Sequence, residues 1–240
     1  MLRPHGHRAM GCKCTPYLVE GREPFLKNFT VWDGLRPHPT TDLKVTIDNG
    51  GFAFKIGRNA PKQIAAAEAA KSLTKLGAVG AYTHASARYW VLRTLQERPY
   101  VLRALIRRYP HILVDEAQDI GPEHEAILRL MVAGGTELSL IGDAHQGIYE
   151  FSGANGAFLS GYGGQPGVAD KKLTINYRSV PAIVEVANKL SGRNDAADRP
   201  APAIMNGAFF IPFNKDEKEK ALATFASMLQ TAAMAEKDGV

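Results

Sequence analysis

The clearest pattern of apolar and polar positions lies in the middle of the chain, between residues 111 and 150. Residues 112–114 (Ile-Leu-Val) and 138–141 (Leu-Ser-Leu-Ile) are short, mostly branched apolar runs. Such runs are typical of strands that are buried in a parallel sheet. Between them, Pro122 begins a helix that two glycines end after Ala133. The pattern therefore predicts a βαβ unit with two buried strands.

The preceding part of the chain predicts a hairpin and three helical segments. Residues 43–47 and 52–56 favour strands and flank an Asp-Asn-Gly-Gly turn, which is a hairpin signal. Residues 61–76 are rich in Ala, Lys and Glu and predict a helix, with a proline in its first turn and a glycine after its end. Residues 84–108 also have a helical pattern, which we expect to break at Pro99.

The C-terminal part alternates strand and helix signals again. Residues 173–176 predict a strand, and Ser179 is expected to cap a helix that runs to Leu190 before a glycine. A further strand is expected at residues 208–211, and a last helix begins near Asp216. Helical spacing in that last helix is expected to bury Leu222, Phe225 and Leu229.

Composition narrows the class of protein. The 240 residues are 45% hydrophobic and 22% charged, as in a soluble protein of one or two domains. The formal net charge of +5 weakly favours a polyanionic partner. Two cysteines cannot stabilise a domain of this size by disulfides, so a reducing, cytoplasmic location is expected. No apolar run is long enough to span a membrane.

Arginines are concentrated in the helical stretch of residues 84–108. The stretch contains six arginines and a single acidic residue, Glu97. The arginines are Arg88, Arg93, Arg98, Arg103, Arg107 and Arg108. Their spacing of about five residues does not keep them on one stripe of a single helix. They are either the solvated faces of two helices, which is the favoured interpretation, or a surface that contacts a nucleic-acid backbone.

An acidic cluster, Asp-Glu-Ala-Gln-Asp at residues 115–119, follows the first predicted strand directly. A carboxylate at the end of such a strand can hold Mg²⁺ while substrate phosphates complete its ligand shell. An adjacent carboxylate can orient or deprotonate a water molecule, as nucleoside triphosphate hydrolysis requires. An Asp-Glu pair can also simply cap the helix that follows.

Two further motifs make hydrolysis the favoured interpretation. Residues 142–154 are Gly-Asp-Ala-His-Gln-Gly-Ile-Tyr-Glu-Phe-Ser-Gly-Ala, and residues 173–179 are Leu-Thr-Ile-Asn-Tyr-Arg-Ser. Together with the acidic cluster, in this order and spacing, they resemble the UvrD/Rep/PcrA group of superfamily 1 DNA helicases. The resemblance is dense from about residue 109 to residue 190 and thin elsewhere.

The resemblance implies an α/β fold with a parallel-sheet, RecA-like motor lobe flanked by helices, followed by the start of a second RecA-like lobe. Residues 1–62 are then a poorly defined N-terminal segment with a candidate β-hairpin. Residues 63–170 form a partial first lobe, with a helical lead-in and the Walker B motif. Residues 171–240 begin the second lobe.

The same resemblance implies roles for five residues around ATP. Asp115 would coordinate Mg²⁺, and Glu116 would be the general base that orients the attacking water. Gln146 would sense the γ-phosphate and couple it to movement. Tyr177 would lie against the adenine or its ribose, and Arg178 would reach the γ-phosphate from the second lobe as an arginine finger.

The implied partner is single-stranded DNA. Tyr149 and Phe151 match positions near the DNA path, where an aromatic ring stacks on a base for about 1–3 kcal/mol. They could equally be core residues of a strand. Ser152 occupies a position where related helicases often have a second arginine for the γ-phosphate, a fixed charge that serine cannot supply.

One motif of the family does not occur in the sequence. The phosphate loop, Gly-x-x-x-x-Gly-Lys-Ser/Thr, has its nearest counterpart in residues 70–72 (Ala-Lys-Ser), which lack the glycine that a phosphate cradle needs. The chain is therefore expected to be an interior portion of a longer helicase. The alternative is a degenerate protein that stands alone.

These features predict an ATP- and Mg²⁺-dependent DNA helicase that translocates on single-stranded DNA. The alternative is a non-catalytic nucleic-acid or partner-binding module that keeps the helicase scaffold. A third interpretation, a metal-dependent nuclease built on Asp115, Glu116 and Asp119, leaves the two later motifs unexplained.

Overall fold

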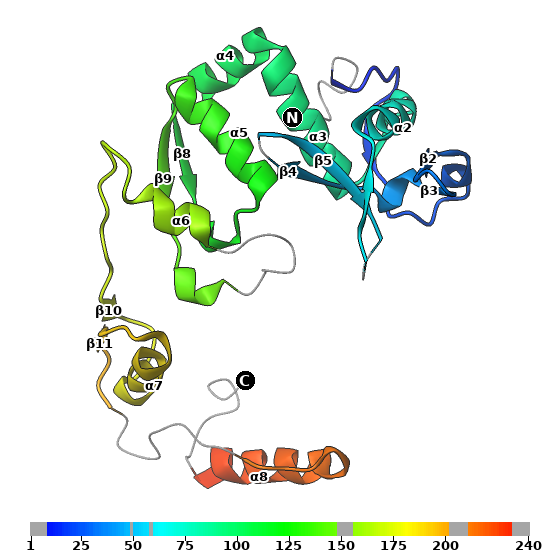
Figure 1. Cartoon of the computed structure of the whole chain (residues 1–240). Helices are drawn as coiled ribbons and strands as arrows, with labels where there is room; N and C mark the ends of the chain where they lie inside the picture. The colour runs from blue at the N-terminus through cyan, green and yellow to red at the C-terminus, as the bar shows by residue number, and fades with distance from the viewer. Residues whose placement is uncertain (1–8, 49, 58–59, 148–155, 202–210, 232–240) are drawn as a thin grey trace. The chain divides into compact units, whose positions relative to one another are not determined.

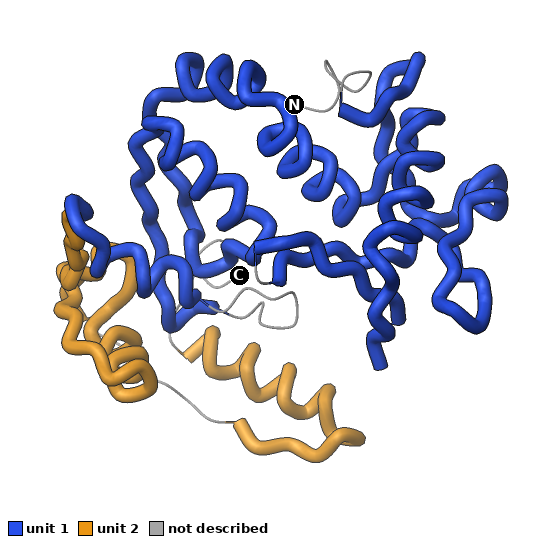
Figure 2. The backbone as a smooth tube through the Cα atoms, turned by 45° about the horizontal axis from the view of Figure 1, so that its top comes forward, with its two compact units in different colours: residues 1–168 blue, residues 169–240 orange. Residues whose placement is uncertain are grey.

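The computed structural model describes residues 9–48, 50–57, 60–147, 156–201 and 211–231. The chain divides into two compact units, residues 1–168 and residues 169–240, drawn in blue and orange in Figure 2. The predicted α/β class is confirmed, because helices combine with five small sheets formed by the described residues. The largest of these sheets has three strands, so the described residues do not form one continuous parallel sheet. The second RecA-like lobe stays a prediction.

The predicted hairpin is confirmed and extended by a third strand. Strands β4 (Lys44–Asp48) and β5 (Gly51–Ile56) are antiparallel, and β6 (Lys62–Ile64) pairs with the other edge of β5. The next helix, α2 (Ala66–Ala78), therefore begins later than the sequence predicts. The helix propensity of residues 61–65 is overridden because their backbone groups complete the sheet instead.

Several short elements precede and follow this sheet (Figure 1). They are β1 (Tyr17–Leu18), η1 (Pro24–Asn28), β2 (Thr30–Trp32), β3 (Pro37–Pro39), η2 (Thr40–Asp42) and β7 (Ala81–Tyr82). Strand β1 is parallel to β7, and β2 is antiparallel to β3.

The turn between β2 and β3 is organised by one carboxylate. Asp33 Oδ1 accepts from the backbone N–H groups of Leu35 at 2.7 Å and Arg36 at 2.8 Å. Asp33 Oδ2 lies 2.8 Å from His38 Nε2 and 3.3 Å from Lys62 Nζ. The Arg36 N–H, the His38 ring and the Leu35 N–H hold the pKa of Asp33 well below its usual range. The turn is thus stabilised by an ionised carboxylate.

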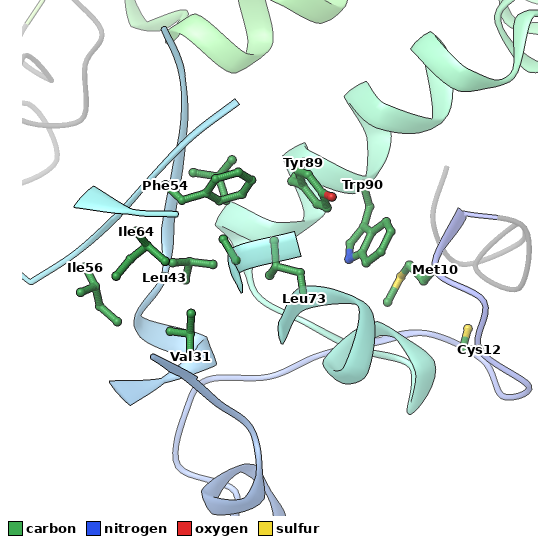
Figure 3. Close-up of a cluster of buried hydrophobic side chains, with 12 residues drawn as sticks. Met10, Cys12, Val31, Leu43, Phe54, Ile56, Ile64, Leu73, Tyr89 and Trp90 are labelled. Atoms are coloured by element: carbon green, nitrogen blue, oxygen red, sulfur yellow. The ribbon is translucent and has the colours of Figure 1, made fainter. Parts of the chain in front are cut away.

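The main hydrophobic core lies between α2, α3 (His84–Glu97) and the three-stranded sheet, as Figure 3 shows. Tyr89 is central to it. Its ring meets Phe52, Phe54 and Trp90 with centroids 4.7, 5.7 and 5.1 Å apart, all in edge-to-face geometry. Gly77 of α2 lets Trp90 approach closely, since a Cβ there would lie 2.9 Å from the indole. The two helices are thereby locked face to face.

The predicted helical stretch of residues 84–108 is confirmed, including its break. Helix α3 begins at a capping box formed by Thr83 and Ser86, and α4 (Pro99–Arg108) begins at Pro99. A proline has no N–H to donate, so it interrupts one helix and suits the first turn of the next.

The βαβ unit is also confirmed. Strands β8 (His111–Val114) and β9 (Glu137–Leu140) are parallel and in register, and α5 (Pro122–Ala133) connects them. The prediction that both strands are buried is wrong, because Leu113 is 61% exposed and Ile141 is also exposed. With only two strands in the described sheet, part of its apolar surface has no covering layer.

The second unit is small and contains few buried side chains. Its elements are β10 (Ile175–Asn176), α7 (Pro181–Ser191), β11 (Ala196–Ala197), η6 (Lys215–Glu217) and α8 (Lys218–Thr231). The short helix α6 (Ala157–Tyr162) belongs to the first unit. Strands β10 and β11 are parallel. No helix in the described ranges is long and apolar enough to cross a membrane.

Four details of the second unit can be compared with the sequence predictions. The N-cap of α7 is Val180 and not Ser179, because Asn176 organises the preceding turn. Leu222 and Phe225 of α8 are exposed and Leu229 is only partly buried, so the predicted burial of all three is wrong. The strand expected at residues 208–211 falls almost wholly outside the described residues. The glycine end of α7 is confirmed by Gly192 with φ +70°.

Candidate functional site

The acidic motif lies directly after β8, where the chain leaves the strand in a tight turn. Glu116 has φ +52° and is the only non-glycine residue with a positive φ among those described. This left-handed conformation costs about 1–2 kcal/mol. Ile141 N–H donates to Val114 O at 2.8 Å, and Ala117 N–H donates to Ile141 O at 2.9 Å. These two bonds extend the parallel ladder across the turn and fix it.

The carboxylates of Asp115 and Glu116 belong to exposed residues with different contacts. Asp115 Oδ1 accepts from the Glu116 backbone N–H at 2.9 Å, so this carboxylate stays beside the strand end. Glu116 Oε2 accepts from Gln118 Nε2 at 2.6 Å. The two acidic groups therefore have different hydrogen-bond partners, and both belong to exposed residues.

Gln118 joins the acidic motif to the motif that follows β9. The residue is only 2% exposed. Its Nε2 donates to Glu116, and its Oε1 accepts from the Asp143 backbone N–H at 3.1 Å. These partners fix the orientation of the amide, because a carboxylate can only accept and a backbone N–H can only donate. One buried side chain thus connects the ends of the two parallel strands.

The backbone at residue 142 passes so close to this amide that only glycine fits. A Cβ on Gly142 would lie 2.5 Å from Gln118 Oε1 and 2.9 Å from Ala117 N. Any side chain at this position would displace Gln118. The glycine of the Gly-Asp-x-x-Gln motif is therefore required by the packing of the acidic motif.

Asp143 organises the loop that carries Gln146. Its Oδ1 accepts from the His145 backbone N–H at 3.1 Å, and its Oδ2 accepts from Gln146 Nε2 at 3.0 Å. The loop contains a 3-10 turn, η4 (Ala144–Gln146), and Gln146 is exposed at its end. The structure thus brings Asp115, Glu116 and Gln146 to the same edge of the β8–β9 sheet.

The donors at this edge suit Mg²⁺, which binds through oxygen and usually takes one or two carboxylates together with waters and substrate phosphates. Asp115 offers an exposed carboxylate at a strand end. Among the described residues, no three His, Cys, Asp or Glu side chains lie together as a protein cage for a metal would require. The residues present therefore fit a cation that arrives with a phosphate ligand.

Asp119 does not join the two exposed carboxylates. Its Oδ1 is buried and has no hydrogen-bond partner within the described ranges. A three-carboxylate centre of Asp115, Glu116 and Asp119, which the nuclease interpretation needs, is not formed by this arrangement.

In the second unit, Tyr177 and Arg178 lie on a turn between β10 and α7. Asn176 Oδ1 accepts from the backbone N–H groups of Arg178 at 3.0 Å and Ser179 at 2.8 Å. This Asx turn presents both side chains to solvent, with Tyr177 69% exposed. Arg199 Nη1 donates to the Arg178 backbone O at 2.9 Å and supports the turn.

The predicted DNA-contacting residues Tyr149 and Phe151, and the divergent Ser152, lie outside the described residues. Their roles stay predictions. Sequence reasoning also missed three residues that shape the site, namely Gln118, Gly142 and Asp143. A signal for Gln118 was present, because it is the one uncharged polar residue inside a run of three acids. Its partner, however, is 25 residues away in sequence.

Comparisons with known proteins agree with the resemblance that the motifs indicate. Residues 48–162 match the family described as UvrD/REP helicase N-terminal domain. The protein YjcD of Bacillus subtilis is 31% identical over 128 residues, which is 51% of this chain and 17% of that protein. The ATP-dependent DNA helicase UvrD2 of Mycobacterium tuberculosis is 37% identical over 84 residues, 35% of this chain and 12% of the helicase.

DNA helicase II of Escherichia coli is 33% identical over 102 residues, 41% of this chain and 14% of that protein. The resemblance to UvrD-type helicases is thereby confirmed. The chain covers less than a fifth of the length of each of these relatives.

Proposed function

We propose that this chain carries the magnesium-facing and water-orienting part of a UvrD-like, ATP-dependent DNA helicase that translocates on single-stranded DNA. The observation that carries the proposal is the buried Gln118 amide, which bonds Glu116 on one side and the Asp143 backbone on the other. It couples the acidic motif to the loop of Gln146. Such coupling is what a motor needs if hydrolysis and movement are to depend on each other.

In this proposal Asp115 would hold the Mg²⁺ that accompanies ATP, and that ion would offset the phosphate charge. Glu116 orients the attacking water. Gln118 donates to Oε2 of Glu116, and Oε1 would orient the attacking water. The left-handed turn supports the same role, since backbone strain of this kind often accompanies functional groups.

Gln146 is the proposed sensor of the γ-phosphate. Its Nε2 now donates to Asp143, a bond that it could exchange for a phosphate oxygen. The Asp143 backbone N–H donates a hydrogen bond to Gln118, and Gln118 donates one to Glu116. The exchange would therefore alter the position of Glu116. Tyr177 and Arg178 would act from the second motor lobe, against the adenine or its ribose and at the γ-phosphate. Tyr149 and Phe151 would stack on DNA bases.

The direct test is ATP hydrolysis by the purified chain, with Mg²⁺ and with or without a single-stranded oligonucleotide. If this chain alone is a motor, single-stranded DNA should stimulate its turnover, and Glu116→Gln should lower that turnover about 10²–10⁴-fold, the range that a general base contributes. Glu137→Gln is the matched control, because its side chain is 83% exposed on the same sheet. Equal turnover in both variants would contradict the role of Glu116.

A second candidate function is a non-catalytic nucleic-acid or partner-binding module. The observation in its favour is that the sequence has no Gly-x-x-x-x-Gly-Lys-Ser/Thr motif to cradle phosphates. DNA binding without ATP hydrolysis under any of these conditions would support the binding module. It would contradict ATP hydrolysis by this chain alone.

A further inference from the structure

The six arginines of α3, α4 and their junction fall into two groups with different surroundings. Those within α3 have partners. Arg88 Nε lies 3.7 Å from Glu123 of α5. Arg93 Nε donates to Glu97 at 2.8 Å, and its guanidinium also lies over the rings of Tyr89 and Trp90. These two side chains are explained by the packing of the first unit.

The other four arginines lie at residues 98, 103, 107 and 108 and have no acidic partner. No ion pair to any of them occurs among the described residues. Among the described residues, the side-chain hydrogen bond of the group joins Arg108 to its neighbour Tyr109, with Nε 3.3 Å from the hydroxyl, and the Arg108 guanidinium also lies over the Tyr109 ring. Residues 98–114 contain no Asp or Glu at all. This is a local excess of positive charge in a chain whose net charge is +5.

The three arginines within α4 lie toward one side of the helix. Tyr100, Arg103 and Arg107 are spaced i, i+3 and i+7, so they share one face of the helix, and all three are exposed. The opposite face is apolar and partly buried, and consists of Val101, Leu102, Leu105 and Ile106. Figure 1 shows α4 at the end of α3, with one side turned away from the first unit.

Stabilisation of the helix end does not explain the whole group. Basic residues in the last turn of a helix interact favourably with its dipole, and this suits Arg107 and Arg108. Arg103 lies in the middle of α4 and Arg98 precedes it, where that effect is weak or unfavourable. The charge excess extends over the full length of the helix.

We propose that the exposed side of α4, formed by Tyr100, Arg103, Arg107 and Arg108 (the α4 face), binds the phosphodiester backbone of a nucleic-acid strand. Guanidinium groups bind phosphate oxygens with two parallel hydrogen bonds. Arg103 and Arg107 are one helical turn apart, about 6 Å along the axis. Between them lies exposed Ala104, whose small side chain lets a strand approach the helix closely.

The identification of a nucleic acid as the polyanion rests on the proposed function. Binding at the α4 face, however, requires neither ATP nor the acidic site. Phosphates are common to single and double strands, so the α4 face should bind both forms. Base stacking by Tyr149 and Phe151 would favour single strands only. Failure of ATP turnover would therefore leave this inference intact, and failure of binding at α4 would leave the acidic site intact.

The test uses the whole chain without nucleotide, a fluorescein-labelled thymidine oligonucleotide and a labelled duplex, and fluorescence anisotropy over a range of salt concentrations. In Arg103→Ala/Arg107→Ala, the log–log salt slope for the single strand should fall by about 1.4, because each lost phosphate contact removes about 0.7. At about 0.1 M salt this corresponds to a roughly 10–30-fold loss of affinity. Duplex binding should weaken as well.

The matched control is Lys71→Ala/Lys75→Ala on α2, which removes two exposed charges one turn apart and without ion pairs among the described residues. It should leave the slope nearly unchanged. Arg103→Lys/Arg107→Lys should keep most of the slope, because the charges remain. Equal losses in the two alanine pairs, or an unchanged slope in Arg103→Ala/Arg107→Ala with native circular dichroism, would overturn the proposal.

Discussion

Residues 9–97 and residues 111–147 of the first unit are stabilised in different ways. The first region holds the large buried apolar side chains, including the cluster around Tyr89 and Trp90. In the second region the buried side chains are few and mostly polar or small, and they include Ala117, Gln118 and Met131. The core region is therefore held by apolar burial, whereas the motif region depends on hydrogen bonds between two strand ends.

This difference has a consequence for function. Apolar burial is non-directional and tolerates little movement in a close-packed core. A few directional bonds at an exposed edge can be exchanged one at a time when a ligand arrives. The second unit extends the contrast, because Val184 is its only buried apolar side chain among the described residues.

The largest effect should come from the centre of the core region. Trp90→Ala should lower the free energy of unfolding by about 3–5 kcal/mol, since it removes a large buried ring and leaves a cavity. Leu113→Ala, in the motif region, should cost far less because that side chain is 61% exposed. Urea denaturation followed by circular dichroism measures both. Similar costs would show that the two regions are stabilised alike.

A smaller effect is expected from the bond between the motifs. Gln118→Ala should cost about 1–3 kcal/mol, because it removes a partly buried hydrogen bond to the Asp143 backbone and a charge-assisted hydrogen bond to Glu116. The loss should be local, and hydrogen exchange at the Asp143 amide should accelerate while exchange in α2 and α3 stays unchanged. Gln63→Ala, at an exposed position of β6, is the control. Unchanged exchange at Asp143 would contradict the coupling of the two motifs.

The smallest effect concerns the turn of the core region that uses charge. The pKa of Asp33 is lower in the folded chain than in the unfolded chain, mainly through the Arg36 N–H and the His38 ring. The stabilisation is therefore complete above the unfolded pKa of about 4 and is lost as pH falls below it. Asp33→Asn should flatten this part of the stability profile. An identical acid profile in the variant would exclude Asp33 as its source.

Much of the local structure could be predicted because it depends on neighbouring residues. The hairpin at residues 44–56, the break at Pro99 and the glycine end of α7 all follow from turn chemistry, ring closure or backbone freedom within a few residues. The start of α2 could not be predicted, because residues 62–64 are taken by a strand partner. The exposure of Leu113 likewise depends on how many strands the sheet has.

For the site, the sequence alone determined the acidic pair, the second motif and the family that they resemble. Only the tertiary structure decided that Gln118 connects them, that Gly142 must lack a side chain, and that the arginines of α4 form no ion pair with the acidic residues described. The physical reason is range. Propensity, capping and motif spacing act over a few residues, whereas hydrogen-bond partners, burial and ion pairing depend on segments that only folding brings together.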